Sequence, residues 1–125
     1  MSALDAIAGI LETLAASEDV PMGSVYYGMC PEEHLDTWNY FVFNRTQTAP
    51  ASNGRDWQTE YAVHIIHEDY IPEGYVGIVR KAFMDSADLV IRATPSAVKY
   101  DYLQKGSTGI VVEIATLYFF VPEKR

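Results

Sequence analysis

The residues best suited to chemistry lie between His64 and Asp69, where two histidines and two acidic residues occur within six positions. Histidine and carboxylate side chains hold metal ions or transfer protons in many enzymes. The segment alternates as a strand, so His64 and His67 point to opposite faces and cannot simply share one ion. A zinc-protease motif would also need two histidines one helical turn apart, with Glu beside the first. We interpret the segment as a strand end that passes into a polar turn, and we predict no metal or cofactor.

Other catalytic signatures are also missing from the sequence. The single cysteine, Cys30, precedes Pro31 and has no basic neighbour that would favour its reactive thiolate form. There is no G-x-S-x-G motif and no glycine-rich phosphate-binding loop. A small hydrolase that uses His64 or His34 remains an alternative, and it requires a nucleophile and an acid within hydrogen-bonding distance of the histidine. We expect that the chain is not an enzyme.

Charge is distributed unevenly along the chain. The net charge is −8, and residues 1–44 contain seven acidic residues and no Lys or Arg. Tight binding of DNA or RNA depends on Lys and Arg that neutralise phosphates, so we do not expect it. No apolar run reaches the roughly 18 residues of a membrane-spanning helix, so we expect no membrane partner either.

The hydrophobic pattern predicts one α+β domain over residues 1–125, with the element order α-β-β-β-α-β-β. We expect two helices packed on one face of an antiparallel, possibly mixed, sheet. The first helix is capped by Ser2 and the second begins near Pro72. Their apolar faces contain Leu4, Ile7, Leu11 and Leu14 in the first helix, and Val76, Val79, Phe83 and Ala87 in the second.

The predicted strands are separated by two recognisable connections. Residues 106–109 form a glycine-bounded hairpin turn, and the polar residues 46–57 form a long exposed loop. A short apolar run at residues 89–93 is a further possible strand. The strands themselves are expected at residues 24–29, 38–43, 58–67, 97–103 and 110–121.

Two of the predicted strands, residues 38–43 and 110–121, are apolar on both faces. Two helices can cover one face of a sheet, and the other face should then be polar. Either the sheet curls until both faces are partly internal, or one face packs against a neighbouring subunit. On the second interpretation the self-association residues are Trp38, Tyr40, Val42, Leu117, Phe119 and Val121.

Three stretches carry a family resemblance that covers nearly the whole chain. They are Val25-Tyr26-Tyr27-Gly28 followed by Cys30-Pro31-Glu32, the strands Tyr40–Phe43 and Tyr61–Ile65 with the helix after Pro72, and the closing strand Gly109–Val121. With these stretches the sequence resembles the small tail-completion and tail-terminator proteins of long-tailed bacteriophages. The resemblance implies a non-enzymatic ring, commonly of six subunits, that ends the tail tube and joins it to the head.

The resemblance also implies partners and a location. The partners would be further copies of the chain, the tail tube protein and the head–tail connector protein. The protein would be made in the cytoplasm of the host bacterium and reside in the virion tail. The partner-contact residues in the polar loop would be Asn53, Arg55 and Trp57. The acidic lining of a channel for DNA would come from Glu12, Glu18, Asp19, Glu32 and Glu33.

One binding function remains as an alternative to assembly. A soluble α+β domain of this size could bind a small ligand or a peptide, with Trp38, Tyr40 and Tyr61 lining the pocket.

Overall fold

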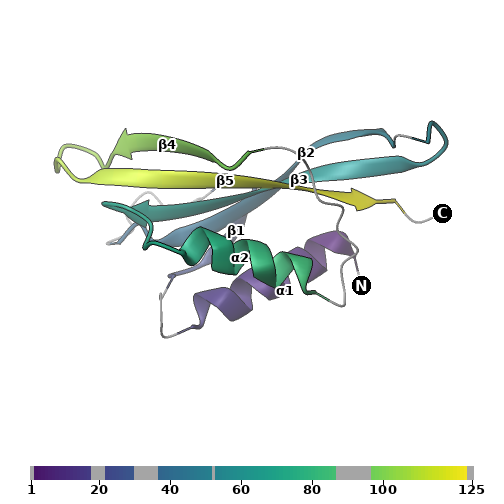
Figure 1. The fold of residues 1–125 in the computed structure, drawn as a ribbon. Coiled ribbons are helices and arrows are strands. Elements are labelled where there is room, and N and C mark those ends of the chain that lie inside the picture. The colour runs from purple at the N-terminus through teal and green to yellow at the C-terminus, as the bar shows by residue number, and fades with distance from the viewer. Residues whose placement is uncertain (1, 18–21, 30–36, 52, 87–96, 124–125) are drawn as a thin grey trace.

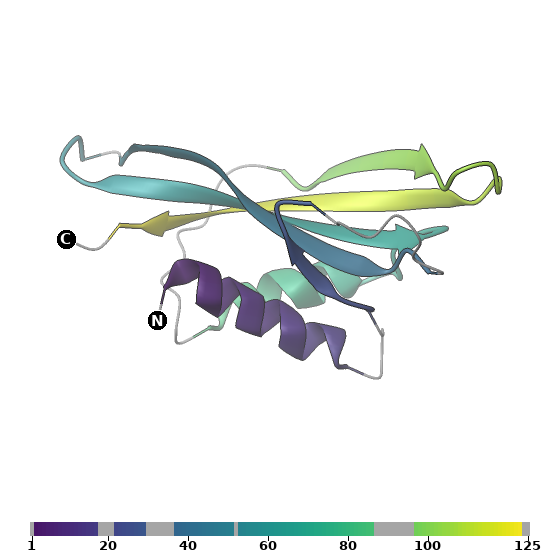
Figure 2. The same cartoon turned by 180° about the vertical axis from the view of Figure 1, so that it is seen from behind.

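Two helices cover one face of a five-stranded sheet (Figures 1 and 2). The computed structural model describes residues 2–17, 22–29, 37–51, 53–86 and 97–123. Its elements are α1 (Ala3–Ala15), β1 (Val25–Tyr27), β2 (Tyr40–Pro50), β3 (Trp57–Glu68), α2 (Tyr75–Met84), β4 (Lys99–Gln104) and β5 (Val111–Pro122). The predicted α+β class and the predicted order of elements are confirmed. The possible strand at residues 89–93 lies outside the described residues.

The strands lie side by side in the order β1-β2-β3-β5-β4, so β1 and β4 form the two edges. β1 runs parallel to β2, and every other neighbouring pair is antiparallel, which makes the sheet mixed. β2 and β3 form one hairpin, and β4 and β5 form the other, and the two turns lie at opposite ends of the sheet (Figure 1).

The two helices begin at residues that suit a helix start. The hydroxyl of Ser2 accepts a hydrogen bond from the backbone N–H of Asp5 at 3.1 Å, which caps α1 as predicted. α2 begins at Tyr75, three residues later than Pro72, because Gly74 adopts a left-handed φ of 83° and turns the chain into the helix. Of the predicted stripe in α2, Val79 and Phe83 are buried and Val76 is partly buried, while Ala87 lies outside the described residues.

The main core lies between the helices and the sheet. Phe83 of α2 stacks on Phe119 of β5 with a centroid separation of 4.8 Å, and Phe41 of β2 stacks on Tyr75 at 6.4 Å. Each fully buried side chain of this size contributes roughly 1.5–3 kcal/mol of hydrophobic stabilisation. These contacts between helix and strand hold both helices on the same face.

Cross-strand register separates the six predicted self-association residues onto opposite faces of the sheet, so that prediction is wrong as a single surface. Leu117 and Phe119 lie in the main core, with 2% and 5% of their surface exposed, and Val121 packs against that core. Trp38, Tyr40 and Val42 lie in a second cluster on the other face, which we call the helix-free face. When a strand is apolar on both faces, its sequence does not show which face the helices will cover. The prediction therefore combined residues of the helix-bearing face with residues of the helix-free face.

The predicted loop at residues 46–57 is also wrong for most of its length. β2 continues to Pro50 and β3 begins at Trp57, so only residues 51–56 separate the two strands. The polar residues pair across the hairpin: the hydroxyls of Thr48 and Thr59 lie 2.9 Å apart, and the Thr46 hydroxyl donates to the Glu60 carboxylate at 2.6 Å. This hairpin is held by backbone pairing and polar contacts, so its composition resembles that of a loop.

Adjacent residues of β5 should respond differently to the same substitution. Phe119→Lys places a charge in the main core and removes the stack on Phe83, so it should cost more than about 3–5 kcal/mol and unfold much of the protein. Phe120→Lys lies on the helix-free face opposite Glu60 and should leave the fold intact. Urea unfolding followed by circular dichroism measures both. Equal stability of the two variants would contradict the assignment of faces.

Candidate assembly surface

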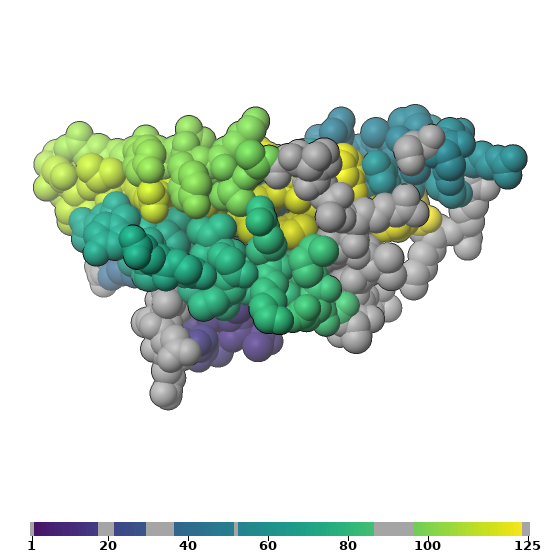
Figure 3. Space-filling model, in the orientation of Figure 1, coloured from purple at the N-terminus to yellow at the C-terminus, as the bar shows by residue number. Residues whose placement is uncertain are grey.

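The outer edge of β4 is open to a further strand. All six residues of β4 are exposed, and no described strand pairs with its outer side. The N–H of Lys105 donates to the carbonyl of Ile110 at 2.8 Å. This bond shows which residues of β4 direct their backbone groups towards β5. By the alternation of an antiparallel ladder, the backbone groups of Tyr100, Tyr102 and Gln104 point away from β5. β4 runs along the upper rim of the molecule in Figure 3.

The distal half of β2, residues 44–50, is a second open edge. β1 pairs only with Phe41–Phe43, and beyond that point the only described partner of β2 is β3. The N–H of Phe41 donates to Ser24 at 3.0 Å, and the carbonyl of Phe43 accepts from Gly28 at 2.9 Å. Backbone groups of alternate residues therefore point outward, and the next in this series is Arg45. The two open edges lie on opposite sides of one sheet and towards opposite ends of its strands (Figure 1).

A groove lies beside β4 on the face that carries the helices. It has a volume of about 460 Å³ and is lined by Tyr70, Ile71, Pro72, Glu73, Gly74, Val76, Gly77, Tyr100, Tyr102 and Glu113. Tyr100 pairs across the ladder with the core residue Ala115, which places its side chain on the helix-bearing face. We call this feature the tyrosine groove. Its three tyrosine side chains are between 48% and 67% exposed, which is unusual for such large rings.

Glu113 organises the tyrosine groove. Its carboxylate accepts hydrogen bonds from the Tyr102 hydroxyl and from the Ile71 backbone N–H, each at 2.8 Å. The first of these bonds raises the pKa of the Tyr102 hydroxyl. The two bonds tie β4 and β5 to the segment that leads into α2, so the walls of the groove keep a fixed separation.

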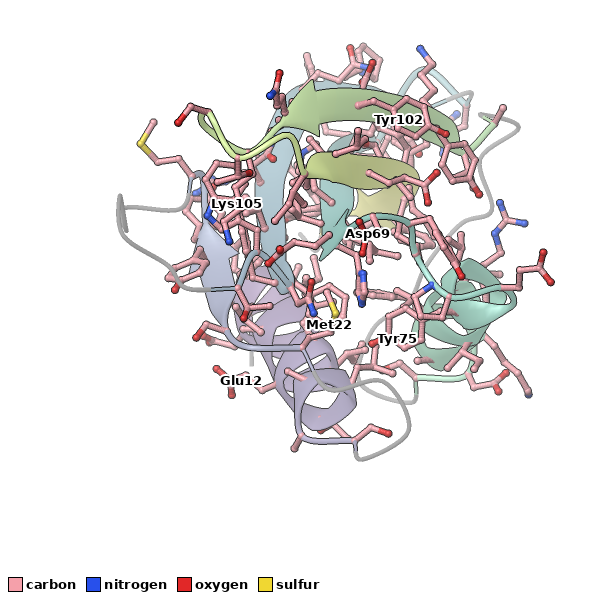
Figure 4. All side chains as sticks on the ribbon, turned by 90° about the vertical axis from the view of Figure 1, so that its left-hand side faces the viewer. Glu12, Met22, Asp69, Tyr75, Tyr102 and Lys105 are labelled. Atoms are coloured by element: carbon pink, nitrogen blue, oxygen red, sulfur yellow. The ribbon has the colours of Figure 1, made fainter. Side chains whose placement is uncertain are left out.

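The end of the molecule that holds the groove is acidic. A second groove of about 650 Å³ adjoins the first and is lined by His67, Glu68, Asp69, Tyr70, Pro72 and Glu73. Among the described residues that line the two grooves there is no Lys or Arg. Figure 4 views this end of the molecule, where Asp69, Tyr102 and Lys105 lie. Exposed aromatic rings beside carboxylates form a favourable environment for a cation.

The apolar cluster of the helix-free face is covered by the chain itself. Val42, Ile66 and Val112 are buried beneath the partly buried side chains of Tyr26, Trp38, Tyr40 and Ile114. Lys105 lies 5.9 Å from the centre of the Trp38 ring and 3.3 Å from the Glu68 carboxylate, which also accepts the backbone N–H of Trp38 at 2.6 Å. This surrounding set of contacts fixes Trp38 over the cluster. No neighbouring subunit is needed to bury these apolar side chains.

His64 lies at the centre of a polar chain on the helix-free face. Its two ring nitrogens are each 2.9 Å from an oxygen, the Thr116 hydroxyl on one side and the Asn44 side chain on the other. Hydroxyl, imidazole and amide in a row match the order of a nucleophile, a base and an orienting group. Thr116 is only 6% exposed, however, and it lies within a strand paired on both sides. We interpret the chain as a network that satisfies buried polar groups.

The other residues relevant to a hydrolase or a metal site give no support for either. The Nδ1–H of His67 donates to the Glu68 carbonyl at 2.7 Å, and His34 lies outside the described residues. No group of three or more potential metal ligands occurs among the residues that the structure describes. Within the same residues, no helix has the length and apolarity to cross a membrane.

The predicted partner-contact residues lie at or beside the turn between β2 and β3. The Asn53 side chain accepts the N–H groups of Arg55 and Asp56 at 2.9 and 3.0 Å, so it shapes the turn. Arg55 and Trp57 are exposed at the surface. The predicted pocket of Trp38, Tyr40 and Tyr61 does not form, because Tyr61 lies in the main core on the opposite face.

Only one of the five residues predicted to form an acidic lining lies among the described residues. Glu12 is exposed on α1, and Glu18, Asp19, Glu32 and Glu33 lie outside the described residues. Sequence reasoning missed the tyrosine groove and both open edges. The available signal was the segment Lys99–Gln104, in which tyrosines alternate with charged residues and no position is strongly apolar until Leu103.

Comparison with known proteins does not extend the family resemblance. No protein-family model matches the sequence, and the search of curated proteins finds no match.

Protonation of His64 should weaken the fold at mildly acidic pH. Burial lowers the pKa of His64, so the unfolded chain binds this proton more readily than the folded chain does. The free energy of unfolding should therefore fall as the pH drops below about 6.5. His64→Gln should make this fall smaller between pH 7 and pH 5.5, as measured by urea unfolding. His67→Gln is the matched control and should keep the fall, and an identical pH dependence in the wild type and His64→Gln would contradict the assignment.

Proposed function

We propose that this chain is a structural, non-enzymatic assembly protein that joins copies of itself head to tail by adding one sheet to the next. The observation that carries the proposal is the pair of open edges, β4 on one side of the sheet and residues 44–50 of β2 on the other. Unpaired strand edges are ready templates for a strand from another chain. The two edges are similar in length, with six and seven residues respectively.

The strand directions favour this arrangement. β2, β3, β5 and β4 alternate in direction, so β4 runs opposite to β2. When a second copy is placed beside the first in the same orientation, its β2 meets β4 as an antiparallel partner. The contact uses two different surfaces of each copy, and such a heterologous contact closes into a ring when the rotation between copies allows it.

On this proposal, the ring terminates the tail of a bacteriophage. The support for this finer identity is the resemblance in sequence together with an element order and a self-assembly mode that suit a ring. Its further partners are the tail tube protein and the head–tail connector protein, and its location is the virion tail. The net charge of −8 suits a ring through which DNA passes without binding.

A peptide-binding domain is the second candidate, and the tyrosine groove favours it. An extended peptide could add to the β4 edge and place a side chain in the adjoining groove. A chain that stays monomeric at tens of micromolar while binding such a peptide would support this candidate over assembly.

Self-assembly is tested by measuring mass in solution and then blocking one edge. Size-exclusion chromatography with light scattering at tens of micromolar should give a multiple of the 14.0 kDa chain mass. Tyr100→Pro removes an outward N–H from β4, so it should abolish the oligomer and leave a folded monomer. Asp101→Pro is the matched change at a position whose backbone faces β5, and it should destabilise the fold instead. A wild-type chain that is strictly monomeric throughout this range would overturn the proposal.

A further inference from the structure

We propose that the tyrosine groove binds the guanidinium group of Arg45 from the neighbouring copy, and that this contact selects how the two open edges join. This inference rests on the proposed self-assembly, and it adds the partner residue, the register and the chemistry of the contact. Arg45 is exposed on β2, and the groove lies beside β4.

The faces of the two strands match. Arg45 pairs across the sheet with Tyr61, and Tyr61 belongs to the main core, so Arg45 points to the helix-bearing face. Tyr100 and Tyr102 point to the same face, because they pair with Ala115 and Glu113. Side chains of directly opposed residues in an antiparallel pair project from the same face. A neighbour's Arg45 therefore arrives on the side of β4 where the groove lies.

The outward-pointing backbone groups of the two strands also match at Arg45 and Tyr102. Arg45 follows Phe41 and Phe43 in the series whose backbone groups point out of the free side of β2, and Tyr102 has outward backbone groups on β4. Arg45 and Tyr102 can thus form a hydrogen-bonded pair across the joint. β1 already occupies Phe43, so a neighbour's β4 can use β2 only from Asn44 onward. Placing Arg45 opposite Tyr102 brings Leu103 opposite Asn44, and beyond Arg45 the bulge of β2 interrupts the regular ladder.

The groove has the chemistry to bind a guanidinium. Its rings come from Tyr70, Tyr100 and Tyr102, and its carboxylates from Glu73 and Glu113. A guanidinium stacks on aromatic faces and donates several hydrogen bonds in a plane to carboxylates. Arg45 is exposed, and among the described residues its side chain donates through Nε to the Tyr27 hydroxyl at 3.2 Å, which leaves other N–H groups of the side chain for a neighbour.

A charge swap tests the contact without altering the core. Arg45→Glu and Glu73→Arg should each weaken self-association at least about tenfold, because each places like charges at the joint. The double variant has a carboxylate at position 45 and a guanidinium at position 73, so opposite charges meet again. It should recover association to within about threefold of the wild type. Arg80→Glu makes the same charge change on the exposed surface of α2 and should leave association unchanged. Analytical ultracentrifugation measures the constants, and circular dichroism checks that each variant is folded.

A cross-link tests the register. In a Cys30→Ser background, Arg45→Cys with Tyr102→Cys should form a ladder of disulfide-linked oligomers under mild oxidation, since opposed residues of a hydrogen-bonded pair lie about 5.5 Å apart at Cα. An intrachain disulfide is excluded, because β3 and β5 separate β2 from β4 within one copy. Arg45→Cys with Lys81→Cys, on the exposed side of α2, should give no ladder.

The outcomes separate this inference from the proposed function. An oligomer that forms in the wild type but survives Arg45→Glu, or that gives no ladder with the first cysteine pair, would overturn the groove contact and leave self-assembly standing. In that case the groove binds another partner or none. A wild-type chain that never associates would overturn both.

Discussion

A mismatch in length between strands and helices governs the shape of this molecule. β3 and β5 each have 12 residues, which span about 40 Å at 3.3 Å per residue. α1 and α2 have 13 and 10 residues, which span only about 20 and 15 Å at 1.5 Å per residue. The helices therefore cover the middle of the sheet and leave its ends projecting. The tyrosine groove lies where this cover is incomplete, and the edges are open because no described strand pairs with the outer side of β4 or with residues 44–50 of β2 on the side away from β3.

The sequence predicted the elements that hydrophobic burial dictates and missed those that it does not. Apolar residues at helical spacing placed α1 and α2, and alternation placed the core half of each long strand. The sequence predicts a loop at the polar end of the hairpin between β2 and β3, because Thr46, Gln47 and Thr48 bury little surface and pair through backbone and hydroxyl groups. The tyrosine groove was missed because Tyr70, Tyr100 and Tyr102 come from segments that only the folded chain brings together.

The helix-free face explains why a sequence can be apolar on both sides of a strand without a second layer of helices. Large side chains can cover smaller neighbours on a sheet, as Trp38 does by packing against a cluster that includes Val42. Such a cover is stable only when its own polar groups are satisfied. The Glu68 carboxylate accepts the backbone N–H of Trp38 and pairs with Lys105, whose ammonium group also lies over the indole ring.

Open edges expose a protein to uncontrolled pairing, and the features at the proposed joint limit which pairings succeed. The bulge between Arg45 and Gln47 interrupts the regular pairing of β2 and increases its local twist. A sheet that continued with regular twist would rotate by roughly 20–25° per strand, or on the order of 100° across five strands, and would wind into an open filament. A closed ring instead requires a different rotation at each joint. Under the proposed assembly, the bulge and Arg45 lie at that joint, so the same few residues would determine both which edges meet and whether the chain of copies closes.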